Sequence, residues 1–132
     1  MADKDFPLFR QILTAAKMEV ASWGGTLLFV YLPDYYRCAD PNFVARTLDP
    51  SKADRDADPR FGIVRLVDSL DIDVIDIAEA FARHEDPLSL YPFREFAHFN
   101  ASGHRHAAET IVESLRRNQR VQPMTGVKAR DK

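Results

Sequence analysis

The sequence predicts an α/β fold in which parallel strands are joined by crossover helices. Two short apolar runs, TLLFVYLP at 26–33 and IDVIDI at 72–77, have the length and composition of strands covered on both faces. The segments around them carry apolar residues every three or four positions, which is typical of helices packed on a sheet. The order helix, strand, helix, strand, helix, helix favours right-handed crossovers between parallel strands.

The first helix is expected to end at Gly24 and Gly25, just before the first strand. Its inward face is predicted to be apolar, with Phe9, Ile12, Leu13, Ala16 and Val20. Residues 34–60 follow the strand as a long charged excursion with three prolines, and we expect one helical turn in it over 43–48.

Helical spacing returns over 60–71, and a short helix is expected over 76–86. Two prolines break the segment that follows, and Asn100 is predicted to cap the last helix. The inward face of this last helix is predicted to consist of Ala101, His104, Ala108, Ile111 and Leu115. We therefore expect a single α/β domain over 1–118 and a basic, flexible tail over 119–132.

Composition excludes several classes of function. The formal charge of −2, from 18 basic and 20 acidic residues, gives no overall attraction to nucleic acid or to an anionic membrane. No apolar run has the ~18 residues of a membrane span. The single cysteine cannot form an internal disulfide, and no cysteine or histidine grouping has the spacing of a metal site. We expect no cofactor, no metal and a cytoplasmic chain.

The segment EFAHFNASGH at 95–104 holds the strongest candidate chemistry. Glu95 precedes His98 by three residues, so a single turn could supply a general base and the carboxylate that orients its ring. On spacing alone, a partly buried histidine beside a solvated glutamate is the more frequent explanation.

The wider sequence favours the catalytic interpretation. Over roughly residues 10–118 the chain resembles the C-terminal half of the SGNH hydrolases, the GDSL-type esterases and their acyl-transfer relatives. The strand ending VIDI, the EFAH quartet and the following NASGH are similar to that family's late strand and to its D-x-x-H and N/P-x-x-G-H motifs. The resemblance implies part of a flavodoxin-like, three-layer domain whose N-terminal strands are missing. It also implies that His98 is the catalytic base.

The chain departs from the family pattern in two respects. Glu95 stands where the family has aspartate, so the orienting acid is either Glu95 or, if the loop folds back, Asp86. The family's G-D-S nucleophile block, oxyanion-hole glycine and G-x-N block, which normally come earlier, are not found. Ser69 does not replace them, because it lies near the end of a predicted helix. We therefore expect the C-terminal portion of an acyl-ester hydrolase that is inactive alone.

The candidate substrate-binding residues are Tyr35, Tyr36 and Asn100. The two tyrosines follow the carboxyl end of the first strand, where open α/β sheets place ligands. They could equally be loop aromatics that cover the core. Cys38 lacks a setting that would lower its pKa, so it is a weak nucleophile candidate.

An apolar strand at 26–32 should not leave its edge in water. We expect it to pair with a second copy of the chain or with a missing N-terminal half. The alternative to a hydrolase is thus a non-catalytic α/β interaction module that forms a homodimer through this edge.

Overall fold

A computed structural model describes residues 6–49, 51–53, 55, 57–95 and 98–117 of the chain. In chain order the elements are α1 (Phe6–Ser22), β1 (Leu28–Tyr31), α2 (Tyr35–Ala39), α3 (Phe43–Leu48), α4 (Pro59–Asp68), β2 (Asp73–Asp76), α5 (Ala78–Ala82), the 3-10 turns η1 (Pro87–Leu90) and η2 (Pro92–Arg94), and α6 (Ala101–Arg117). The predicted order of strands and helices is confirmed.

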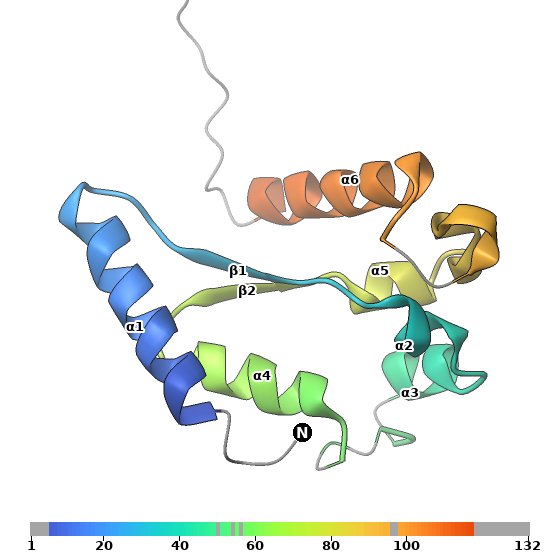
Figure 1. The fold of residues 1–132 in the computed structure, drawn as a ribbon, viewed down its shortest axis with the longest axis horizontal. Coiled ribbons are helices and arrows are strands. Elements are labelled where there is room, and N and C mark those ends of the chain that lie inside the picture. The colour runs from blue at the N-terminus through green and yellow to red at the C-terminus, as the bar shows by residue number, and fades with distance from the viewer. Residues whose placement is uncertain (1–5, 50, 54, 56, 96–97, 118–132) are drawn as a thin grey trace, which may run out of the picture.

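The two strands form a parallel pair in which Leu28 lies beside Asp73 and Tyr31 lies beside Asp76. In the part of the chain that the structure describes, this sheet has two strands. Figure 1 shows three layers, with α1 and α4 on one face of the sheet and α6 on the other. The molecule is therefore a mostly helical α/β protein with parallel strands, as the sequence predicts.

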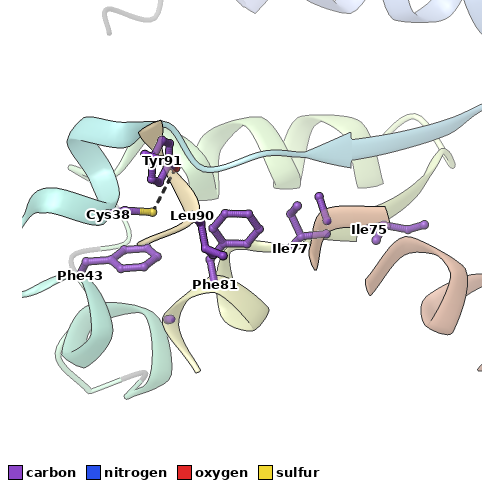
Figure 2. Packing of buried hydrophobic residues seen from close by; sticks show 9 residues of the cluster. Cys38, Phe43, Ile75, Ile77, Phe81, Leu90 and Tyr91 are labelled. Atoms are coloured by element: carbon purple, nitrogen blue, oxygen red, sulfur yellow. Dashed lines mark hydrogen bonds between the residues drawn. The ribbon is translucent and has the colours of Figure 1, made fainter. Parts of the chain in front are cut away.

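Alternation along the strands divides the interior into two clusters. Phe29 and Val74 pack with apolar residues of α1 and α4, whereas Val30 and Ile75 pack with those of α6. The larger cluster, on the α6 side, continues past the carboxyl ends of the strands to Phe81, Leu90 and Tyr91 (Figure 2). That end of the sheet thus carries the larger of the two clusters and forms the base of the candidate site.

Two predicted helix faces were wrong in detail. In α6 the buried residues are Gly103 and Ala107, while Ala101, His104 and Ala108 are exposed. The predicted Ile111 and Leu115 do pack against the core, so the prediction fails only in the first half of the helix. The reason is that Gly103, without a Cβ, is the residue that can lie against the Leu90 carbonyl. In α1, Leu13 is buried but Ile12 is 55% exposed, because Ile12 lies on the flank of the helix and not on the side that faces the sheet.

The excursion after β1 is more ordered than its prolines and charges predict. It contains α2 as well as the expected turn at α3. The Asp34 carboxylate accepts a hydrogen bond from the Arg37 N–H at 2.7 Å and so caps α2. The predicted tail at 119–132 lies outside the described residues.

Candidate functional site at the carboxyl end of β1

An open hollow of about 500 Å³ lies where β1 ends. It is lined by Leu32, Pro33, Asp34, Tyr91, His98, Phe99 and His104. Most of these side chains are apolar, and the polar ones are an acid and two histidines. Parallel α/β sheets place their ligands at this end of the strands. The hollow is therefore the position in this fold at which a reacting group would be expected.

The segment that carries His98 is attached firmly at both of its ends. At one end the buried Tyr91 hydroxyl donates to the Pro33 carbonyl at 3.0 Å, which ties the segment to the end of β1. At the other end the Asn100 amide side chain donates to the Ser89 carbonyl at 2.8 Å. The Asn100 N–H also donates to the Leu90 carbonyl at 3.0 Å. His98 is thus held beside β1 by contacts made by its neighbours.

Asn100 has a structural role that the sequence predicted. Its side-chain oxygen accepts from the Gly103 N–H at 2.9 Å, which caps the start of α6. Both ends of its side-chain amide are therefore already bonded. As a substrate-binding residue it could offer little without giving up the cap or the bond to Ser89.

The His98 ring itself is exposed at the hollow. Among the described residues neither its nitrogens nor the Glu95 carboxylate, which is also exposed, has a hydrogen-bond or ion-pair partner. Asp86 pairs with Arg94, and this bond holds the pKa of the Asp86 carboxyl below its usual range. Of the two acids considered for orienting the ring, Glu95 is therefore the uncommitted one.

The floor of the hollow is aromatic. The Phe99 ring contacts Phe81, Tyr91 and His104, with ring centroids 4.9, 5.3 and 5.8 Å apart. His104 was predicted to face the core, but it lies exposed in the hollow with His98. It is exposed because Gly103 and Ala107 are the residues that α6 buries at this end, which spacing alone did not reveal.

The two tyrosines after β1 lie in different places. Tyr35 is half-buried and packs its ring edge-on against Tyr91 at 5.6 Å, so it supports the site from below. Tyr36 is 72% exposed and lines a second hollow with residues of α3, away from His98. The structure thus brings Tyr35 toward the His98 segment and leaves Tyr36 outside it.

Cys38 is buried next to Tyr91. Its sulfur lies 3.4 Å from the Tyr91 hydroxyl oxygen (Figure 2), and burial raises the pKa of the thiol. A buried thiol with a raised pKa is a poor nucleophile. This agrees with the weak case that the sequence made for it.

Sequence reasoning missed a charged network beside the second hollow, whose lining includes Arg37 and Asp58. Arg37 forms a two-pronged ion pair with Asp58 at 2.8 and 2.9 Å, and the buried Arg60 pairs with Asp76 at 2.6 Å. Burial by itself would raise the pKa of Asp58, but the bonds from Arg37 and from the Arg60 N–H outweigh it and lower that pKa. The network joins the start of α4 to α2 and to the end of β2. These partners are 21 and 16 residues apart, and no spacing rule connects them.

No group of three or more potential metal ligands occurs in the described part of the chain. None of its described helices has the length and apolar character needed to cross a membrane. Comparisons with family models, with curated proteins and with solved structures give no significant match.

Proposed function

We propose that this chain is the C-terminal portion of an SGNH-like acyl-ester hydrolase, in which His98 is the general base. The observation that carries the proposal is the placement of His98. Its exposed ring lies over an open, mostly apolar hollow at the carboxyl end of a parallel strand, on a segment bonded at both ends. The same proposal includes a flavodoxin-like sheet, in which the missing N-terminal strands lie beside the two strands of this chain.

In the proposed reaction, His98 removes the proton of a serine hydroxyl as the oxygen attacks the acyl carbon. The same ring then returns the proton to the leaving alcohol. The serine and the oxyanion donors come from residues that are not in this sequence, because none of its serines stands on a tight turn after a strand.

Glu95 is the proposed orienting acid. Its carboxylate is exposed and unpaired among the described residues, whereas Asp86 is occupied by Arg94. A carboxylate on one ring nitrogen fixes the tautomer and leaves the other nitrogen to act as the base. Phe99 and Leu32 offer the acyl group an apolar surface.

The proposal predicts different results for the short chain and for a longer one. The 132-residue chain alone should hydrolyse a short acyl ester no faster than free imidazole at the same concentration. A reading frame extended upstream of Met1 should contain a G-D-S block, and its product should hydrolyse the ester. There His98→Ala should lower kcat by about 10²–10⁴-fold, the usual contribution of a general base.

His84 provides the matched control. It is partly buried and lies in a different hollow, beside Glu85 and His106. His84→Ala should leave kcat of the longer protein unchanged. Equal activity of the His98→Ala and wild-type proteins, or an upstream frame without a serine block, would contradict the proposal.

A further inference from the structure

Phe93 is held in water by a strained turn. It is 93% exposed, more than any other large apolar residue in the described part of the chain. Its φ is 54° and that of Arg94 is 60°, so two consecutive residues other than glycine have left-handed backbone. A bulky residue rarely adopts this conformation. The chain therefore holds Phe93 against its backbone preference and also against the hydrophobic effect.

The contacts that fix this turn are made by its neighbours and not by the Phe93 ring. The Arg94 N–H donates to the Tyr91 carbonyl at 3.2 Å. The Arg94 side chain pairs with the Asp86 carboxylate. An ion pair thus accounts for the side chain of Arg94, but no contact within the described part of the chain accounts for that of Phe93. Backbone strain that the surroundings maintain is concentrated at functional sites in proteins.

The turn lies beside the hollow that contains His98. Tyr91 and His98 both line the hollow, and the turn is the part of the chain between them. The Phe93 Cα is at most about 7 Å from the Tyr91 Cα, because two residues span no more than this. The Glu95 N–H donates to the Pro92 carbonyl at 3.0 Å, which keeps the turn compact. Figure 1 shows this segment beyond the carboxyl ends of the strands, next to the start of α6.

The hollow gives an acyl chain an apolar surface of limited extent. Leu32 and Phe99 line it, and it is open to solvent. A long acyl chain that leaves the hollow enters water unless an apolar surface continues beyond the opening. The Phe93 ring supplies such a surface, whereas an acetyl group would not extend far enough to use it.

We infer that Phe93 is a specificity-determining residue, whose ring contacts the outer part of a medium-length acyl chain such as octanoyl. The inference rests on the proposed function, because it places the acyl group of the substrate in the hollow. The strained turn keeps the ring in position before the substrate arrives, at the expense of stability. The preferred esters then carry medium-length acyl chains rather than acetyl groups.

The first test is thermal unfolding of the 132-residue chain. Phe93→Asn should raise Tm by about 4 °C, because asparagine adopts left-handed backbone more readily than phenylalanine. Phe93→Tyr should leave Tm unchanged, since it keeps both the ring and the strain. Val112→Asn replaces another exposed apolar residue, on α6, where the backbone is helical, and it should not raise Tm.

The second test is binding of octanoate and butyrate to the same chain, followed by the NMR signals of the Phe99 and His104 amides. Octanoate is the acid that an octanoyl ester releases. Phe93→Asn should weaken octanoate binding by about tenfold, because the methylenes that butyrate lacks lose an apolar neighbour. Butyrate binding should not change. Phe93→Tyr and Val112→Asn should bind both acids as the wild type does.

Two results would overturn the inference. One is equal affinity of the Phe93→Asn and wild-type chains for octanoate, and the other is a Phe93→Asn chain that is no more stable than wild type. Both measurements use the 132-residue chain and need no turnover. Ester hydrolysis that does not depend on His98 would instead refute the proposed function and leave the octanoate result as measured.

Discussion

Gly103 allows a direct test of the close packing of α6 against η1. It lies in the first turn of the helix and is buried. A Cβ built on it would lie 2.9 Å from the Phe99 Cβ and closer still to the Leu90 carbonyl oxygen. That carbonyl also accepts the Asn100 N–H at 3.0 Å. The added methyl group of Gly103→Ala would therefore press on a backbone atom that cannot rotate away.

The expected loss is about 2 kcal/mol in the free energy of unfolding. Overpacking a close contact costs ~1–3 kcal/mol. Weakening the hydrogen bond from Asn100 to Leu90 adds roughly 0.5–1.5 kcal/mol. Against these, alanine is better than glycine in a helix by up to about 1 kcal/mol, and by less in the first turn. For a chain of this length the net change lowers the melting temperature by about 8 °C.

Urea unfolding followed by circular dichroism measures this difference, and Gly62→Ala is the matched control. Gly62 is inside α4, and a Cβ there would meet only the end of the Phe6 ring, at 3.2 Å. A side chain can move by that amount, so Gly62→Ala should be neutral or stabilise by up to about 1 kcal/mol. If Gly103→Ala proves as stable as Gly62→Ala, the close approach of α6 to η1 is wrong.

Three further predictions concern bonds around the site. Tyr91→Phe leaves the buried Pro33 carbonyl without its donor, so it should cost about 1–2 kcal/mol in urea unfolding; an unchanged midpoint would contradict this. Asn100→Ala removes the cap of α6 and the bond to η1, and a loss of about 2 kcal/mol is expected, with Asn100→Asp, which keeps the cap, less affected. The pKa of Asp58 is below its ordinary value of 3.8, so the stability from its pair with Arg37 is complete above that pH and is lost as pH falls through the folded-state pKa. Asp58→Asn should therefore be less stable than wild type at pH 7, and the difference should shrink in acid; a constant difference from pH 7 to pH 2 would refute the assignment.

The strands and longer helices could be predicted because their signals are local. The unbroken apolar run of β1 and the three- and four-residue spacings of α1 and α6 appear in any window of the sequence. The sequence determines less well which residues of a helix face inward. Ile12 is as apolar as Leu13, and only the position of α4 shows that it points sideways. The short α2 was missed because one carboxylate, that of Asp34, organises it against an unfavourable composition.

The candidate site was predictable in part for the same reason. His98 is marked by its neighbours in sequence, and Asn100 is marked as a cap by its position before an apolar repeat. The contact between Tyr91 and Pro33 joins residues 58 apart, so it depends on the whole fold. The place of His104 in the hollow depends on the contact of Gly103 with the Leu90 carbonyl, which sets which residues of α6 are buried.

The bonds that hold Tyr91 and Asn100 bring the two ends of the segment 91–100 close to one spot, over Leu90 and the end of β1. Compact surface loops whose ends meet in this way form modules that a scaffold carries without depending on their interior. Inserted or exchanged residues between these two anchors would change what faces the hollow while the layers beneath stay as they are. Variation in this loop is therefore the simplest route by which chains of this architecture could acquire new specificities.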